Sequence, residues 1–159
     1  MTAFAPERAA DLAEIQQKIY RYGWCIDHRT FDELDGLFTE DAIVHYDLPG
    51  GAKKPWPEMK AWLPQGLQLF RVTQHNMSNP LVVFEGDTAR ATTYGNLVHV
   101  QHHKDDTTSV MRHHTIYRDR WVKRGGEWRI AARTLSNLFM DGPVFGPDRV
   151  HLYPEPKPF

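Results

Sequence analysis

The sequence predicts an α+β fold in which a curved, mostly antiparallel sheet wraps over three N-terminal helices and encloses a pocket. Two patterns support this prediction. In the first part of the chain, apolar residues recur at spacings of three and four, which is the period of a helix. Most of the later chain consists of long stretches rich in Thr, Val, Tyr and Trp, which are typical of strands. Helices followed by a run of strands is an order found in α+β domains.

Three helices are expected before the strand-rich part. The first helix should end near Asp27, and its apolar positions lie on one face: Leu12, Ile15, Ile19, Tyr22 and Ile26. The capping-box pattern Thr30-Phe31-Asp32-Glu33 then predicts a short helix that runs through Leu37 and Phe38. A third helix should follow Pro57, and Pro64 is expected to stop it.

Strands are predicted over residues 42–47, 81–85, 88–103, 108–123 and 127–139. The pair Gly125-Gly126 lies between the last two of them and indicates a hairpin turn. A long sheet of few strands must curl around the helices to bury one face, and curling leaves a concave cavity of the kind that ligands prefer.

Composition narrows the class of protein. The chain has 159 residues, which fits one domain over 1–140, followed by a tail over 141–159 that holds five of the 11 prolines. Proline cannot donate to a sheet, so we expect the tail to pack on the surface or on a neighbouring subunit rather than to pair in the sheet. A net charge of −1 argues against a nucleic-acid partner. No apolar run approaches the roughly 18 residues of a membrane span, and the amino terminus does not resemble a signal peptide. A cytoplasmic location is therefore expected.

Reactive residues are few apart from histidine. The single Cys25 excludes an internal disulfide framework, whereas nine histidines are an excess. The chain contains no GxSxG, HExxH, Walker or GxGxxG motif, so we expect a reaction without a nucleophile, cofactor or metal. A metal site built from His75, His99 and either His113 or His114 is a less favoured alternative.

Four segments in order carry a resemblance to a known family: Tyr22-Gly23-Trp24-Cys25-Ile26-Asp27, FDELDGLFTEDAIVHYD, TQHNMSNP and the closing hairpin YRDRWVKRGGEWRIAARTL. Over about residues 10–140 the chain resembles the SnoaL-like branch of the nuclear transport factor 2-like superfamily. This branch includes scytalone dehydratase, bile acid 7α-dehydratase and hexachlorocyclohexane dehydrochlorinase. The resemblance implies a cone-shaped α+β barrel with a deep pocket, and a homo-oligomer, with a trimer favoured over a dimer.

The resemblance also implies roles for particular residues. His75 falls where these lyases keep a catalytic base, and Asp27 falls where they keep the aspartate that orients it. Tyr22 and Tyr46 match pocket tyrosines that bind or protonate a leaving oxygen. Ile26 departs from the pattern, because scytalone dehydratase has a second tyrosine at that place.

Substrate contacts are expected from three further residues. Arg133 matches a pocket arginine of the dehydrochlorinase. That enzyme also has a pocket lysine where this chain has Tyr22, which disfavours dehydrohalogenation. Trp24 belongs to the same motif as Tyr22, and Asn96 lies on one of two strand faces, either of which could line the cavity. Which of the remaining histidines line the pocket stays open: His99, His102, His113 and His114.

The expected activity is a cofactor-independent, dehydratase-type elimination on a cyclic or aromatic small molecule. Removing a proton from carbon needs a base whose pKa is near the working pH, and a histidine oriented by a carboxylate meets that need. An isomerase or polyketide-cyclase reaction in the same pocket is an alternative, because it also begins with removal of a proton near a carbonyl. A second alternative is a non-catalytic binding or assembly module of the same fold.

Overall fold

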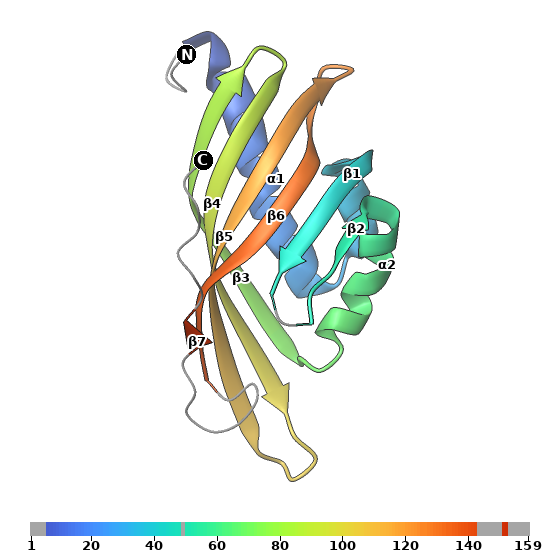
Figure 1. Ribbon diagram of the computed structural model, residues 1–159, viewed down its shortest axis with the longest axis vertical. Helices are drawn as coiled ribbons and strands as arrows, with labels where there is room; N and C mark the ends of the chain where they lie inside the picture. The colour runs from blue at the N-terminus through green and yellow to red at the C-terminus, as the bar shows by residue number, and fades with distance from the viewer. Residues whose placement is uncertain (1–5, 49, 143–150, 153–159) are drawn as a thin grey trace.

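A strongly bent sheet with one long helix against its inner face makes up most of the molecule (Figure 1). The structure is a computed structural model that describes residues 6–48, 50–142 and 151–152. The helical elements are η1 (Pro6–Arg8), α1 (Ala9–His28), η2 (Phe31–Gly36) and α2 (Trp56–Leu67). The strands are β1 (Phe38–Asp47), β2 (Lys53–Pro55), β3 (Val72–Glu85), β4 (Thr88–His102), β5 (Thr108–Arg124), β6 (Glu127–Asp141) and β7 (His151–Leu152).

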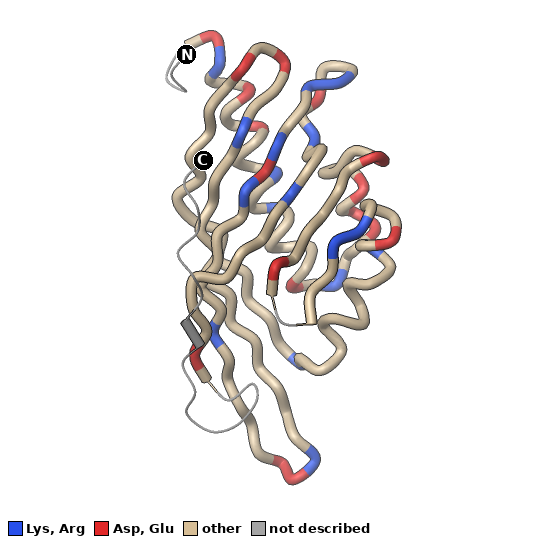
Figure 2. Tube along the Cα trace, viewed as in Figure 1, with Lys and Arg blue, Asp and Glu red and all other residues tan. Residues whose placement is uncertain are grey.

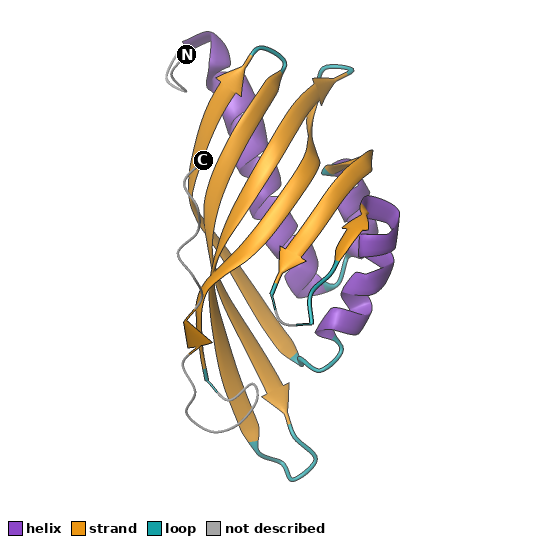
Figure 3. Cartoon of the chain, in the orientation of Figure 1, coloured by secondary structure: helices purple, strands orange, loops and turns teal. Residues whose placement is uncertain are grey.

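Within the described residues the sheet has seven strands: six in the order β2-β1-β6-β5-β4-β3, and β7 paired to β6. Strands β3 to β6 form an antiparallel meander, as the sequence predicts. Strand β1 instead joins β6 in parallel, with Val44 opposite Arg133 and Tyr46 opposite Leu135. Figure 3 shows α1 crossing the meander while α2 stands beside β1 and β2. The α+β prediction is confirmed, and the curved sheet remains open rather than closing into a complete barrel.

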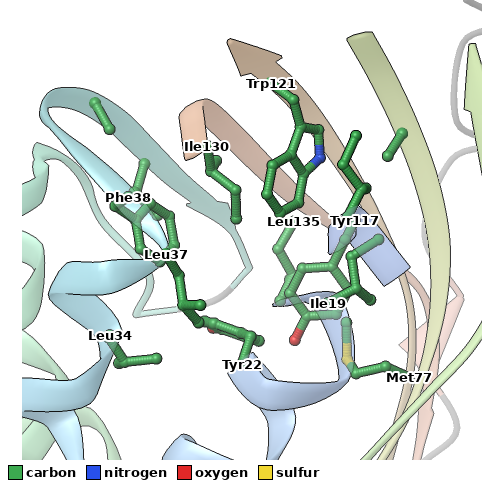
Figure 4. Packing of buried hydrophobic residues seen from close by; sticks show 14 of the residues in the cluster. Ile19, Tyr22, Leu34, Leu37, Phe38, Met77, Tyr117, Trp121, Ile130 and Leu135 are labelled. Carbon is green, nitrogen blue, oxygen red and sulfur yellow. The ribbon is translucent and has the colours of Figure 1, made fainter. Parts of the chain in front are cut away.

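The hydrophobic core lies between α1 and the sheet. Ile15, Ile19 and Ile26 of α1 are fully buried, as the helical spacing of the sequence predicts. Figure 4 shows Ile19 and Tyr22 of α1 in the same buried cluster as Tyr117, Trp121 and Leu135 of the sheet. Charged residues of both signs are interspersed over the upper part of the molecule and are sparse along the long lower part of β4 and β5, except at the hairpin tip (Figure 2).

Two helices differ in detail from their predictions. The second helix is a 3-10 helix that ends at Gly36, and Thr30 makes no side-chain capping bond. The carboxylate of Glu33, which a capping box would use, pairs with Arg21 instead. The third helix is predicted to stop near Pro64; in the structure Pro64 lies in the last turn of α2, which ends at Leu67.

Strand β3 begins earlier than predicted. The sequence indicated only residues 81–85, whereas the strand starts at Val72. The break comes at Asn79-Pro80: Asn79 has φ of 51°, and the pairing with β4 shifts register between Ser78 and Leu81. This irregularity hides the first half of the strand, which carries His75, from an alternation pattern.

The expectation for the tail over 141–159 falls mostly outside the described residues. Within it, β7 pairs with Phe139 and Met140 of β6, contrary to the expectation that the tail stays out of the sheet. This pairing is possible because β7 lies in a proline-free stretch between Pro147 and Pro154. In the part of the chain that the structure describes, no helix is long and apolar enough to cross a membrane.

Gly23 allows α1 to pack closely on β3. A Cβ atom at this position would lie 2.7 Å from the carbonyl oxygen of His75 and 3.2 Å from its Cβ. The oxygen belongs to backbone, so it can move only if the strand moves. The absence of a side chain at Gly23 therefore sets the distance between the helix and the strand that carries His75.

Replacing Gly23 with alanine should destabilise the fold. Alanine favours a helix interior by about 1 kcal/mol over glycine, but overpacking typically costs about 1–3 kcal/mol, and here the clash is with backbone. We expect the Gly23→Ala variant to unfold at lower urea concentration than the wild type. Gly36→Ala is the matched control, because a Cβ there meets nothing within 4 Å. A stability for Gly23→Ala equal to or above wild type would contradict the close-packing argument.

Candidate active site

A cavity of about 270 Å³ lies between α1, α2 and the inner face of the sheet. Side chains from α1, β1, α2 and strands β3 to β6 line it, and most of them are apolar. Among the described residues, no Lys, Arg, Asp or Glu belongs to the lining; its titratable groups are histidines and tyrosines. The volume is near the lower end for ligand pockets, which run from about 300 to 1,000 Å³. The cavity therefore suits a small, mostly apolar molecule.

Asp27 and His75 form a hydrogen-bonded pair at the wall of this cavity. Asp27 lies in the last turn of α1, and its Oδ1 is 2.6 Å from Nδ1 of His75. Its Oδ2 accepts a second hydrogen bond, of 2.7 Å, from the backbone N–H of His75. Both side chains are largely buried, with exposed fractions of 6% for His75 and 16% for Asp27. The carboxylate thus fixes the position of the ring and leaves Nε2 as the ring nitrogen available to a ligand.

Tyr22 and Tyr46 bring two phenols together in the same cavity. Their hydroxyl oxygens are 2.6 Å apart, and both side chains are buried. Burial raises the pKa of Tyr22 and raises the pKa of Tyr46 well above its usual value. Both groups are therefore neutral phenols at pH 7. In such a pair one hydroxyl donates to the other, so one O–H is left to donate to a ligand.

His99 and His113 also line the cavity, which answers the question that the sequence left open. They follow His75 across the sheet, with ring centroids 5.6 Å apart for His75 and His99 and 4.8 Å apart for His99 and His113. Burial, together with the smaller effect of the neighbouring histidines, lowers the pKa of His99 to about 2 and that of His113 to about 4. Both rings are neutral at pH 7. His102 is exposed, and His114 is bonded to Asn96 on the outer face of the sheet.

Arg133 is not among the residues that line the cavity. Its guanidinium is fully buried and makes two hydrogen bonds of 2.7 Å to the carboxylate of Asp119, which lies opposite it on β5. The Cζ atom lies 4.0 Å from the centre of the Tyr22 ring and 4.9 Å from that of Tyr117. Burial opposes the charge on Arg133, but the Asp119 carboxylate outweighs it and raises the pKa. The pair lies behind the ring of Tyr22, so the structure places Arg133 outside the lining rather than in the pocket position that the sequence predicts.

Trp24 and Asn96 also lie outside the cavity, so their predicted substrate contacts are wrong. Trp24 has an exposed fraction of 58% and stacks on His28 at 4.0 Å, because it is on the solvent side of α1. Asn96 is exposed and faces away from the helix, since the alternate residues Leu97 and His99 point inward. Strand parity left two faces open, and the inward one is the face with His99.

Sequence reasoning missed two residues of this region, Tyr117 and Asp119. Tyr117, interpreted as ordinary core, lines the cavity, and its hydroxyl is buried without a hydrogen-bond partner in the described chain. Both residues share strand parity with His113, which is the signal that could have found them. Within the described ranges, no group of three His, Cys, Asp or Glu side chains is arranged to hold a metal ion.

Comparison with known proteins decides the family. The model of the SnoaL-like domain matches residues 7–134. The chain belongs to the SnoaL-like family. It is also 36% identical over 132 residues to an uncharacterized protein of Mycobacterium tuberculosis, covering 82% of this chain and 87% of the relative.

Solved structures share the fold of this SnoaL-like chain. A candidate scytalone dehydratase from Novosphingobium aromaticivorans has a TM-score of 0.71 at 23% identity, covering 88% of this chain and 92% of that one. A hexachlorocyclohexane dehydrochlorinase from Novosphingobium barchaimii has a TM-score of 0.74 at 16% identity, covering 92% and 97%. The fold is therefore one that dehydratases and dehydrochlorinases use. The matched part of this SnoaL-like domain runs from η1 into β6 and contains Asp27, His75, Tyr22 and Tyr46.

Breaking the buried ion pair should be costly for the SnoaL-like domain. In Asp119→Asn, the guanidinium of Arg133 stays buried without a counter-charge, and losing one partner of such a pair costs about 3–5 kcal/mol. The double variant Asp119→Leu/Arg133→Met should recover most of that loss, because it removes both charges. Asp41→Asn, at the exposed pair with Arg124, is the matched control and should change little. Urea unfolding measures the stability of all three variants. If Asp119→Asn were as stable as the wild type, the cost assigned to breaking the ion pair would be refuted.

The buried histidines should make the fold sensitive to mild acid. Because the pKa values of His99 and His113 are lower in the folded than in the unfolded chain, their stabilisation is complete above the ordinary histidine pKa of about 6.5. It is lost as pH falls toward about 4 for His113 and about 2 for His99. We expect the free energy of unfolding to fall by about 1 kcal/mol per pH unit per histidine below pH 6.5. His99→Gln should reduce the dependence of the unfolding free energy on pH, whereas His102→Gln, at an exposed position, should leave it unchanged. Equal pH dependence in His99→Gln and the wild type, measured by urea unfolding, would contradict this prediction.

Proposed function

We propose that this protein is a cofactor-independent lyase that removes water from a small cyclic or aromatic hydroxyketone. The observation that carries the proposal is the pairing of His75 with Asp27 at the wall of an apolar cavity that also contains the Tyr22–Tyr46 phenol pair. A base, a group that orients it and a hydrogen-bond donor for oxygen are the components that an elimination needs. None of them requires a bound nucleophile or coenzyme.

His75 acts as the base in this proposal. With Nδ1–H donated to Asp27, its Nε2 carries the lone pair that takes a proton from the carbon next to the substrate carbonyl. The electrons of that C–H bond form the new double bond, and the C–O bond on the adjacent carbon breaks. The departing hydroxyl takes up the proton held by His75 and leaves as water, so the protein returns to its starting state. The carboxylate of Asp27 stabilises the imidazolium between the two transfers.

The tyrosine pair binds the oxygen on which charge develops. Because burial raises the pKa of both phenols, they act as hydrogen-bond donors and not as proton sources. A donor that is preorganised in a dry site contributes about 3–4 kcal/mol of transition-state stabilisation. The Arg133–Asp119 pair behind the ring of Tyr22 holds that phenol in place. The small apolar cavity limits the substrate to one or two rings.

Substitution of the base tests this proposal. Cyclic β-hydroxyketones of one and two rings serve as probes, because loss of water gives a conjugated enone or a phenol that absorbs in the near ultraviolet. We expect His75→Gln to lower kcat by about 10²–10⁴-fold, the usual contribution of general base catalysis. Asp27→Asn should lower kcat by a comparable factor, because an amide cannot stabilise the imidazolium.

Matched controls separate chemistry from folding. His102→Gln and Asp32→Asn make the same changes at exposed positions outside the cavity and should leave kcat unchanged. Circular dichroism should show the same fold for all variants. Turnover by folded His75→Gln at the wild-type rate would reject His75 as the base, and absence of elimination on every probe by the wild type would reject the dehydratase assignment.

A further inference from the structure

His99 is one of the polar groups of the cavity that the proposed elimination does not use; the others are Gln101, Ser109, His113 and Tyr117. Its side chain is 5% exposed and lines the cavity from β4. The ring nitrogen Nδ1 is shut off from solvent and has no hydrogen-bond partner in the described chain. The ring contacts are with Phe70, His75 and His113, and none of these is a hydrogen bond.

The surroundings of His99 favour one neutral tautomer of its imidazole. Burial lowers the pKa of His99 to about 2, so the ring is neutral and carries one N–H. An enclosed N–H without an acceptor is more costly than an enclosed lone pair without a donor, which favours the tautomer with the proton on Nε2. Since Nδ1 is enclosed, Nε2 is the ring nitrogen that a ligand in the cavity can reach. His113 does not offer its Nε2 to a ligand in the same way, because this nitrogen lies 3.0 Å from the sulfur of Met111.

The absence of charged side chains from the described lining limits which ligands the cavity can bind. The described lining has no Lys or Arg to meet a carboxylate or phosphate. Arg133 lies outside this lining: its Nε and Nη2 are bonded to Asp119, and its Nη1 is buried without a hydrogen-bond partner in the described chain. Transferring an anion into such a site without a partner is strongly unfavourable. A neutral oxygen, in contrast, needs only one donor.

We propose that His99 is a specificity-determining residue whose Nε2–H binds a second, uncharged oxygen of the ligand, so that the cavity selects neutral molecules with two oxygen functions over acids. The substrate class is then a neutral cyclic compound in which one oxygen meets the Tyr22–Tyr46 pair and another meets His99. This inference rests on the proposed function for the identity of the reacting oxygen, but the selection itself is a property of binding. It can therefore be measured without turnover.

Calorimetric titration at pH 7 tests the inference in a His75→Gln background, in which the proposed elimination does not consume the probe. Three matched bicyclic probes are used: a hydroxyketone, the ketone that lacks the hydroxyl, and a carboxylic acid of the same ring system. With His99 intact, this protein should bind the hydroxyketone about tenfold more tightly than the ketone and should bind the acid more weakly than both. His99→Phe should abolish the preference for the hydroxyketone. His99→Gln, which keeps a neutral donor, should retain part of it. His114→Phe, the same change on the outer face of β5, should behave as the wild type.

The outcomes separate this inference from the proposed function. Binding of the acid as tightly as the hydroxyketone, or an unchanged preference in folded His99→Phe, would overturn the role of His99, even if His75-dependent elimination were observed. A His99-dependent preference for the hydroxyketone would support the inference even if no probe were dehydrated, and in that case only the lyase assignment would fail. If His99→Phe does not fold, loss of part of the preference in His99→Gln supports the inference, and full retention overturns it.

Discussion

The carboxylate of Asp27 joins the two halves of the structure at the site. One oxygen accepts the backbone N–H of His75 and the other meets Nδ1 of its ring, so a single side chain fixes both the strand and the imidazole. The contact is possible because α1 approaches β3 closely at Gly23. The paired tyrosines of the cavity, Tyr22 and Tyr46, come from α1 and β1, and their positions follow from how these elements dock on the sheet. A polar interaction at the end of one helix thus orders a cavity that is otherwise apolar.

The polar groups in and behind the cavity wall differ in protonation and charge. The tyrosines and His99 are kept neutral by burial, whereas Arg133 and Asp119, outside the lining, keep their charges by pairing with each other. A cavity arranged in this way has hydrogen-bond donors but no fixed charge facing a ligand. Such a site favours reactions in which a proton moves away and returns, because no permanent charge competes for the developing one.

Much of the fold follows from pattern alone. The apolar face of α1 and the Gly125-Gly126 turn are local signals, so the α+β class and the meander could be predicted. The parallel pairing of β1 with β6 could not, because it joins distant segments and leaves no periodic trace. Strand parity identifies two faces of β4 but not the inward one, so the sequence alone cannot decide between Asn96 and His99 as a residue that lines the cavity. Arg133 was placed by resemblance to a pocket arginine, and only the register with Asp119 shows that its charge is used inside the protein.

The parallel joining of β1 and β6 has a consequence for how the site comes into being. Tyr46 reaches Tyr22 only when β1, near the start of the chain, lies against β6, near its end. Contacts between such distant segments close large loops, and the entropy of closure delays them relative to hairpins. The meander that carries His75, His99 and His113 is built from neighbouring strands. In a folding chain the row of imidazoles is therefore expected to form before the pair of phenols, because the phenol pair needs the long-range joining of β1 and β6.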